Sequence, residues 1–443
     1  MKNRTKIELV LGISFILVIS GMGILGRTIT STSDDIETFI RNSNGNVYAV
    51  TGPNIQTAIW SLNSTDGGTV YLPEGTIDAS GIDLINNITI IGTGYGTHLK
   101  IPDNTNDNVF YEKTGVNNVI IENIYFDENV DNNIDTGSTT VHNGIYLFNS
   151  NNCTIKNCWF YGFFAHGVLF STDSCYNIVE NCYFEYHNGS ALVSFRRSNH
   201  NSYKNIYITR QRTENGIYTH EDCHNIFMYN VHCYDFLDGC EAGITVTTNC
   251  DAKIINCYIT DNPNIVGINI GSLGALSNNN TITGCVLRNL TGTAYNHGCG
   301  MHIYGSYNII SNNMFIDIGD IGIYTKDDGK YNQIINNIFQ NCDDDPIYLR
   351  GVKNFIITNN IFVDCADDIY YYSDINLAEN IIKDNIDTFT QKDNSVFPLY
   401  VQSNAPTLVS NTTAYWLNTD GPWLYQVANC FGQTFYVNMS DTP

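Results

Sequence analysis

The chain has 443 residues, a length that accommodates one large domain or two ordinary ones. Only 15% of the residues are charged and 43% are hydrophobic, so the chain can bury a core and is not intrinsically disordered. A formal net charge of −23 excludes a protein that coats nucleic acid or an anionic membrane surface. The 29 tyrosines and the frequent asparagines favour strands over helices.

The first thirty residues differ from the rest. Lys2, Arg4 and Lys6 precede an apolar run without charges from Leu9 to Gly26, which is at the short end for a membrane span. A positive flank before an apolar stretch is typical of a secretory signal or an N-terminal membrane anchor. We expect residues 1–30 to be such a segment, so that the protein is extracellular or on the cell surface, either anchored by its N-terminus or secreted. No Ala-x-Ala-like cleavage site follows, which favours the anchor.

A short repeat runs through most of the chain. The unit Ile-x-Asn-x-x-Phe recurs every 23 to 34 residues, with its central Asn or Gly at positions 123, 157, 181, 205, 230, 256, 284, 312, 336 and 359. A second short strand follows in most units, as in Gly144-Ile-Tyr-Leu. Both strands alternate apolar and other residues. Such a unit cannot bury its own apolar face, so successive units must stack as a solenoid, with Asn at a sharp left-handed turn.

These units resemble the right-handed parallel β-helix repeats of the pectin-lyase-like superfamily. The resemblance covers residues 46–385 and includes the opening typical of that family, an amphipathic helix near residues 55–62 and a Gly-Gly turn before a strand. It implies an all-β solenoid of ten or eleven coils whose N-terminal helix caps the open end of the stack. Residues 386–443 are expected to form a small β cap or an oligomerisation segment.

Strand alternation predicts which side chains leave the core. The residue after Ile145 and its equivalents should point outward, as should the residue two positions further along, which places two columns rich in Tyr, with His, Lys and Arg among them, on one face. Exposed rings on a flat sheet are a platform for sugars, although Tyr is also simply a good strand residue. The longer spacings insert loops near 127–143, 271–280 and 288–299 that could wall a cleft. The candidate glycan-binding residues are Tyr146, Tyr218, His302, Tyr304, Tyr324, Lys326, Tyr348 and Arg350.

One end of this face carries candidate catalytic groups. His220, Glu221 and Asp222 end one strand, and Arg196 and Arg197 align with them one coil earlier. Arginine could neutralise the carboxylate of an acidic sugar while His220 acts as the base of a β-elimination. The alternative is a polar strand end whose charges only pair with one another.

A hydrolase would instead need two carboxylates about 5–10 Å apart. Glu221 with Asp238 or Glu241 is the pairing that the sequence suggests.

The inward position directly after the central residue of each unit is occupied by cysteine in some units and by asparagine in others. Cys158, Cys182, Cys257 and Cys285 fall directly after the central residue of their units and are expected in the core, whereas Asn313, Asn337 and Asn360 in that position predict an internal ladder. A disulfide between Cys342 and Cys365 is not favoured, because stacked side chains point in parallel.

The sequence contains no Cys-x-x-Cys pair, so a zinc site is not expected. Calcium is the one cofactor that the sequence allows. Calcium could bind acidic turns such as Asp343-Asp344-Asp345, which otherwise are simply solvated.

The catalytic motifs of β-helix hydrolases and pectate lyases are missing. No Gly-His-Gly or Arg-Ile-Lys occurs, and Asn418-Thr419-Asp420 lies in the tail, beyond the repeats. Because a fold alone does not determine a function, two hypotheses stay open. The first is a surface protein that binds a polysaccharide or cell-surface glycan and could also cleave it, as a lyase or a glycoside hydrolase. The second is a non-catalytic structural protein, either an adhesin-like surface protein or a virus spike. For the virus spike, a homotrimer formed through the tail would be the signature.

Overall fold

The computed structural model describes residues 40–41, 45–48, 52–138, 140–237, 239–272, 274–292, 298–325, 329–365, 369–372, 379–387, 400–401, 413–417, 424–430 and 433–438. It divides the chain into two compact units, Met1–Ile386 and Asp387–Pro443. Helix α2 (Gly52–Asn63) begins the described part of the first unit, and Ile55, Ala58, Ile59 and Leu62 on it are fully buried. Among the described helices, none combines the length and apolar character that a membrane crossing requires. The predicted anchor, Leu9–Gly26, lies outside the described residues.

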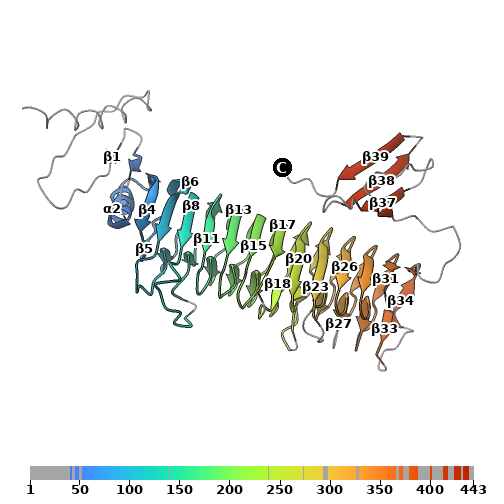
Figure 1. Cartoon of the computed structure of the whole chain (residues 1–443). Coiled ribbons are helices and arrows are strands. Elements are labelled where there is room, and N and C mark those ends of the chain that lie inside the picture. Colours follow the sequence, from blue (N-terminus) through green and yellow to red (C-terminus); the bar gives the residue numbers. More distant parts are fainter. Residues whose placement is uncertain are drawn as a thin grey trace, which may run out of the picture. The chain divides into compact units, whose positions relative to one another are not determined.

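The first unit is a solenoid of parallel strands (Figure 1). The second strands of the repeats form a twelve-stranded ladder, so the solenoid has about twelve turns and not ten or eleven. The extra rungs precede the first copy of the repeat. The ladder consists of β5 (Ile82–Asp83), β7 (Phe110–Glu112), β9 (Ile145–Phe148), β12 (Val168–Ser171), β14 (Leu192–Phe195), β16 (Ile217–His220), β18 (Ala242–Val246), β21 (Val266–Ile270), β24 (Met301–Ile303), β27 (Ile323–Thr325), β30 (Ile347–Leu349) and β33 (Ile369–Tyr371).

The strands of the Ile-x-Asn-x-x-Phe units form a second sheet of 23 strands. Five long strands bend within it: β6 (Ile88–Lys100), β8 (Ile120–Asp127), β13 (Ile178–Glu185), β15 (Ser202–Thr209) and β17 (Ile226–Tyr234). In the other units the bend separates two strands. The strands before the bend are β3 (Gly68–Tyr71), β10 (Thr154–Lys156), β19 (Ala252–Ile255), β22 (Thr281–Thr283), β25 (Ile309–Ser311), β28 (Gln333–Ile335), β31 (Ile356–Thr358) and β34 (Ile381–Lys383). The strands after the bend are β4 (Gly75–Asp78), β11 (Trp159–Tyr161), β20 (Tyr258–Pro263), β23 (Val286–Thr291), β26 (Met314–Ile318), β29 (Ile338–Cys342), β32 (Ile361–Val363) and β35 (Ile386–Asp387).

Two short strands, β1 (Ile40–Arg41) and β2 (Val47–Tyr48), pair with each other antiparallel, and β2 joins β3. The second unit of the chain is a four-stranded sheet in the order β36 (Tyr400–Val401), β37 (Thr413–Leu417), β38 (Leu424–Cys430) and β39 (Gln433–Asn438).

The bends confirm the role predicted for the central residue. Asn157, Asn181 and Asn205 have φ between 52° and 54°, and the same left-handed conformation occurs at Gly284, where glycine replaces asparagine. These asparagines also form a chain of side-chain hydrogen bonds, in which Nδ2 of Asn181 donates to Oδ1 of Asn157 at 3.2 Å and Nδ2 of Asn205 donates to Oδ1 of Asn181 at 2.9 Å. Asparagine therefore fixes the turn and links it to the previous rung.

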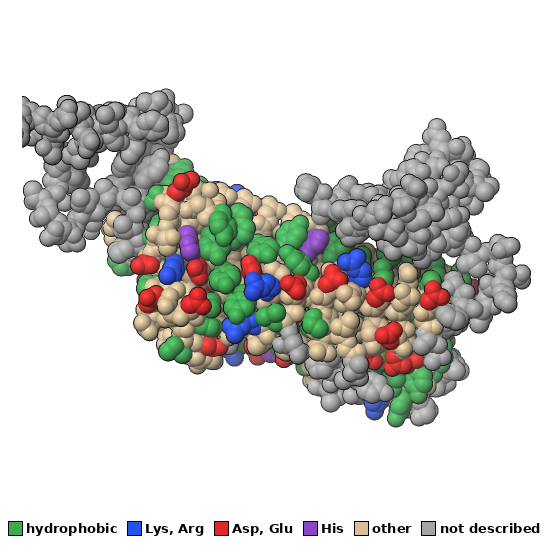
Figure 2. Space-filling view, in the orientation of Figure 1, with side chains coloured by type: hydrophobic (Ala, Val, Ile, Leu, Met, Phe, Trp, Pro, Cys, Tyr) green, Lys and Arg blue, Asp and Glu red, His purple; other side chains and the backbone are tan. Residues whose placement is uncertain are grey.

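A column of aromatic rings lies on the outer surface of the 23-stranded sheet, apart from the rings predicted on the twelve-stranded ladder. It occupies the position before the Phe of each unit, and its rings include Tyr125, Trp159, Tyr183 and Tyr207. Figure 2 shows hydrophobic side chains gathered on this face, with acidic and basic side chains along one side. His232 continues the column between Tyr207 and Tyr258, with ring centroids 4.7 and 4.6 Å away. The ring faces are therefore covered by neighbouring rings.

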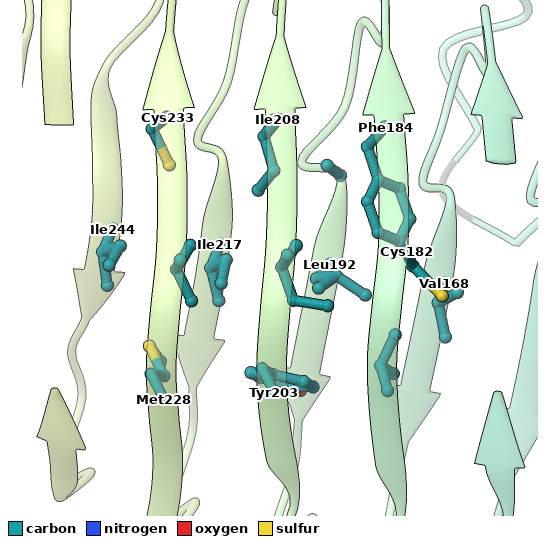
Figure 3. Packing of buried hydrophobic residues seen from close by; sticks show 14 of the residues in the cluster. Val168, Cys182, Phe184, Leu192, Tyr203, Ile208, Ile217, Met228, Cys233 and Ile244 are labelled. Atoms are coloured by element: carbon teal, nitrogen blue, oxygen red, sulfur yellow. The ribbon is translucent and has the colours of Figure 1, made fainter. Parts of the chain in front are cut away.

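The core is one continuous apolar cluster that follows the solenoid (Figure 3). Val168, Leu192 and Ile217 from the twelve-stranded ladder face Phe184 and Ile208 from the other sheet. The predicted inward cysteines are buried, and all 13 cysteines whose side chains the structure describes are free thiols, including Cys342 and Cys365. The internal asparagine ladder is also confirmed: Nδ2 of Asn313 donates to Oδ1 of Asn337 at 3.1 Å.

Candidate functional site

From β7 onward, strand pairing places one outward side chain of each rung of the twelve-stranded ladder in a single row. We call this row the outer column. Its members alternate with core residues such as Ile145 and Ile217, as predicted. A second outward residue follows two positions later in some rungs, such as Phe148, Phe195 and His220. In rung order the outer column is Tyr111, Tyr146, Leu169, Val193, Tyr218, Thr245, Asn269, His302, Tyr324, Tyr348 and Tyr370.

The first half of the outer column is apolar. Tyr146, Leu169 and Val193 form a cluster separate from the core, and Tyr111, Phe148, Phe195 and Tyr218 pack against it. From Thr245 onward the column becomes polar for three rungs. An apolar stripe thus runs along the outside of the solenoid from β7 and ends at Tyr218.

The other predicted glycan-binding residues lie along the second half of the ladder. His302, Tyr324 and Tyr348 belong to the outer column, and Tyr304, Lys326 and Arg350 follow them two positions later in the sequence. Tyr304, Tyr324 and Tyr348 form another cluster outside the core, and the rings of Tyr324 and Tyr348 lie 5.1 Å apart. The Arg350 guanidinium lies 4.9 Å above the ring of Tyr372. Lys326 lies outside the described residues.

The expectation that the predicted rings are exposed is wrong for most of them. Tyr146, Tyr304 and Tyr348 are 8% exposed, and His302 and Tyr324 are 5% exposed. Because rungs of a sheet are only about 4.8 Å apart, rings on neighbouring rungs cover each other. Tyr370 on the last rung is 44% exposed, and Tyr218 is half-buried.

The structure brings the predicted catalytic residues together at the end of β16. The backbone N–H of Arg196 donates to His220 O, and that of Arg197 donates to Glu221 O, at 3.1 and 2.8 Å. His220 stacks between Phe195 and Tyr218, with ring centroids 5.7 and 5.2 Å away. Burial lowers the pKa of His220, so it is neutral at pH 7.

The charged groups around His220 are already paired. Nε of Arg196 donates to Oε2 of Glu221 at 2.9 Å. Arg197 binds Asp173 of the preceding rung through two hydrogen bonds of 2.9 Å. Asp222 accepts a 2.8 Å hydrogen bond from Nδ2 of Asn249. These exposed side chains therefore satisfy one another across rungs, as the alternative interpretation holds.

Two carboxylates that the sequence analysis did not pair with each other lie at the opposite end of β16. Glu241 follows Glu214 by one rung, since its backbone N–H donates to Glu214 O at 3.2 Å. Both carboxylates act electrostatically on Tyr218, and burial raises the pKa of Tyr218 to about 12. Sequence reasoning missed Glu214, and it considered Glu241 only as a partner for Glu221. A signal was present, because each glutamate lies two residues before the glycine that opens the next strand, Gly216 or Gly243.

The longest insertion contains a buried contact between a carboxyl group and a histidine. Nδ1 of His142 lies 2.6 Å from Oε1 of Glu128, and both side chains are fully buried. Burial raises the pKa of Glu128 to about 7. Further along this insertion, Oδ2 of Asp135 accepts a 2.9 Å hydrogen bond from Nδ2 of Asn188, two rungs away. The insertion therefore leans along the solenoid toward Glu214.

Among the residues that the structure describes, no three His, Cys, Asp or Glu side chains are arranged to hold a metal ion. Asp238, Asp327 and Asp328 are outside that set, and calcium stays a prediction from the sequence.

Parallel rungs, left-handed asparagine turns and an outward side-chain column define a right-handed parallel β-helix protein. Residues 143–294 and 276–413 match the family model described as "Right handed beta helix region", and the chain belongs to this family. No curated protein matches the chain.

Solved structures share the fold at low sequence identity. The mannuronan C-5 epimerase AlgE6 A-module of Azotobacter vinelandii aligns with a TM-score of 0.54 and 14% identity, over 76% of this chain and 95% of that module. The tailspike protein of E. coli bacteriophage HK620, solved in complex with a pentasaccharide, aligns with a TM-score of 0.54 and 14% identity. That alignment covers 70% of this chain and 62% of the tailspike protein.

Proposed function

We propose that this protein binds a polysaccharide along the outer column of the twelve-stranded ladder and acts on it. The observation that carries the proposal is the apolar stripe from Tyr111 to Tyr218, which lies outside the core. Tyr146, Leu169 and Val193 form its buried base, and Tyr111, Phe148, Phe195 and Tyr218 present half-buried rings to a sugar. Sugar rings present C–H faces to apolar and aromatic side chains, and polar groups beside such a platform orient the sugar hydroxyls. The fold is shared with a tailspike protein solved with a pentasaccharide and with an epimerase of mannuronan, which supports this class of ligand.

The charges around the site favour a neutral glycan over an acidic one. Arg196 and Arg197 are the cations next to His220, and both already bind carboxylates. The carboxylates of Glu214, Glu241 and Asp222 surround the same rungs, so a uronate chain would meet an excess of negative charge. We therefore propose a neutral polysaccharide as the ligand, in place of the acidic sugar that the arginines suggested.

A binding experiment tests the proposal. The purified protein is run through gels containing galactomannan, dextran, xylan or polygalacturonate, and its retardation is compared with that of two variants. Tyr218→Ala should weaken retention by one neutral polysaccharide at least tenfold, since it removes the end of the stripe. Tyr207→Ala removes a ring of similar exposure on the opposite sheet and should leave retention unchanged. Equal losses in both variants, or no retention of the unmodified protein, would refute the proposal.

A binding protein without catalytic activity is the second candidate, favoured by the paired charges around His220. It would retain the same polysaccharide while producing no new reducing ends and no ultraviolet-absorbing products. Light scattering would also show whether the protein is a homotrimer, and removal of residues 386–443 should then yield monomers.

Export belongs to the same proposal, because a protein that binds a cell-surface or extracellular polysaccharide must itself leave the cytosol. The positive flank and the apolar run Leu9–Gly26 support a surface protein that is tethered or secreted. Recovery of the intact protein from the cytosolic fraction would contradict export.

A further inference from the structure

We infer that Glu214 and Glu241 are the two carboxylates of a glycoside hydrolase site, with Tyr218 as its hydrogen-bond donor. This inference rests on the proposed glycan binding along the outer column. It names the bond that is cleaved and the residues that cleave it.

The two glutamates occupy equivalent places on adjacent rungs, in the turns that lead into β16 and β18. The backbone hydrogen bond from Glu241 to Glu214 places them one rung apart, and rungs are separated by about 4.8 Å. Retaining glycosidases hold their two carboxyl groups about 5–5.5 Å apart, whereas inverting enzymes need a wider gap for a water molecule. Each carboxylate binds the equivalent residue of its preceding rung, Ser190 or Asn215, so the two carboxylates lie about one rung apart, which matches the retaining geometry.

In each glutamate, only one of the two carboxylate oxygens accepts hydrogen bonds from residues that the structure describes. Oε2 of Glu214 accepts hydrogen bonds from the backbone N–H and from Oγ of Ser190, both 3.1 Å long. Oε2 of Glu241 accepts from Nδ2 of Asn215 at 3.2 Å, and Oδ1 of the buried Asn215 accepts from Oγ1 of Thr245 at 2.6 Å. Within the described residues, no hydrogen bond engages the Oε1 atom of either glutamate.

The pair lies where the apolar stripe ends. Val193 and Leu169 precede Tyr218 in the outer column, and Thr245 follows it. The hydroxyl of Tyr218 has no hydrogen-bond partner in the described part of the chain, and its high pKa keeps its proton in place at neutral pH. A sugar chain seated on the stripe would therefore extend past Tyr218 to the two carboxylates.

The acids near His220 are less suited to this chemistry. Glu221 is bound by Arg196, and Asp222 is bound by Asn249. An engaged carboxylate must lose its partner before it can attack or donate a proton, whereas Glu214 and Glu241 keep one oxygen available.

The reaction that this arrangement allows has two balanced steps. Oε1 of Glu214, which Ser190 orients, attacks the anomeric carbon while the glycosidic C–O bond breaks and the Glu241 carboxyl gives its proton to the leaving oxygen. Water then loses a proton to Glu241 and displaces Glu214 from the anomeric carbon. The products are two shorter sugar chains that together contain one added water, and the anomeric configuration is retained.

The experiment measures binding and cleavage separately. The full protein is incubated with galactomannan, dextran or xylan, and new reducing ends are counted while gel retardation reports binding. Glu214→Gln and Glu241→Gln should each lower the cleavage rate by about a thousandfold and change binding less than twofold. Glu185→Gln, an equivalent change on the opposite sheet, should alter neither quantity.

A second readout distinguishes a nucleophile from a residue that only supports the fold. Glu214→Gly with added azide should release a glycosyl azide of inverted anomeric configuration, detectable by NMR. Full cleavage in either Gln variant, or binding by the unmodified protein with no cleavage, would overturn this inference while leaving the proposed binding of a polysaccharide intact. Absence of all binding would instead refute the proposed function.

Discussion

Asn337 donates a 3.0 Å hydrogen bond from its side-chain amide to Oδ1 of Asn360, and both residues are fully buried. Asn360 makes the same bond to Asn385, and Asn313 makes it to Asn337. Each asparagine therefore supplies a donor to one neighbour and an acceptor to the other. A polar ladder of this kind is stable inside an apolar core only while every member is present.

We expect that interrupting the asparagine ladder strongly lowers the free energy of unfolding. Asn337→Ala should lower the free energy of unfolding by about 2–4 kcal/mol, because it leaves buried groups on both neighbours without partners. Cys182→Ala changes the same inward position in another rung and removes only weak sulfur contacts. Urea titrations of the two variants should show the larger shift for Asn337→Ala, and equal shifts would contradict a structural role for the ladder.

The glycines that open the second strands are predicted to resist substitution. A Cβ on Gly322 would lie 2.4 Å from the carbonyl oxygen of Pro346 and 2.8 Å from the ring of Phe339. Gly322→Ala should therefore destabilise the fold by about 1–3 kcal/mol through overpacking. Ala191 occupies the equivalent position on another rung, so Ala191→Gly is the matched control and should cost less than about 1 kcal/mol. Thermal unfolding measures both, and a neutral Gly322→Ala would show that the rungs can separate locally.

Because Glu128 is buried, we expect the folding stability of the protein to fall as the pH rises through neutrality. Its pKa of about 7 in the folded protein lies above the ordinary value of 4.5, so the folded state binds the proton more tightly than the unfolded state. The stabilisation is complete below pH 4.5 and is lost as the pH rises through 7. Glu128→Gln cannot titrate, so the stability difference between the two proteins should change between pH 5 and pH 8. A constant difference in urea midpoints across that range would refute this role.

We expect the cysteines of the native protein to react slowly with thiol reagents. Burial raises the pKa of Cys153 to about 11, and among the 13 described thiols only Cys175 and Cys365 are not buried. With Cys430 replaced by Ser, a colorimetric thiol reagent should label at most these two in the native protein and all 13 in urea. Faster labelling of Cys182 in the native state would show that the core opens.

Variants of Arg197 and His220 distinguish recognition of an acidic sugar from the proposed recognition of a neutral polysaccharide. Arg197→Ala should leave cleavage of the neutral polysaccharide within twofold, since the guanidinium is held by Asp173 on the preceding rung. His220→Ala should weaken binding severalfold, because it removes a ring stacked on Tyr218. A loss of activity in Arg197→Ala of a hundredfold or more would restore the arginines as binding groups.

The fold was predictable because each rung repeats the same physical requirements. An apolar residue at Ile121, a left-handed residue at Asn123 and an aromatic residue at Phe126 recur often enough to reveal the period. The exposure of Tyr324 and Tyr348 was not predictable, since it depends on how rings of adjacent rungs cover each other. Glu214 and Glu241 could have been paired from the sequence, because each lies two residues before the glycine of its second strand. Counting from the central Asn205 and Asn230 hides this match, since the two intervening segments differ in length.

The insertion between Glu128 and His142 has one further consequence. It lengthens one turn by about ten residues, yet Tyr146 still pairs with Tyr111 on one side and Leu169 on the other. Turn length and strand register are thus independent variables in this scaffold. Glu214 and Glu241 occupy the same kind of turn, so new chemistry can be grafted at that edge without rebuilding the rungs that support it.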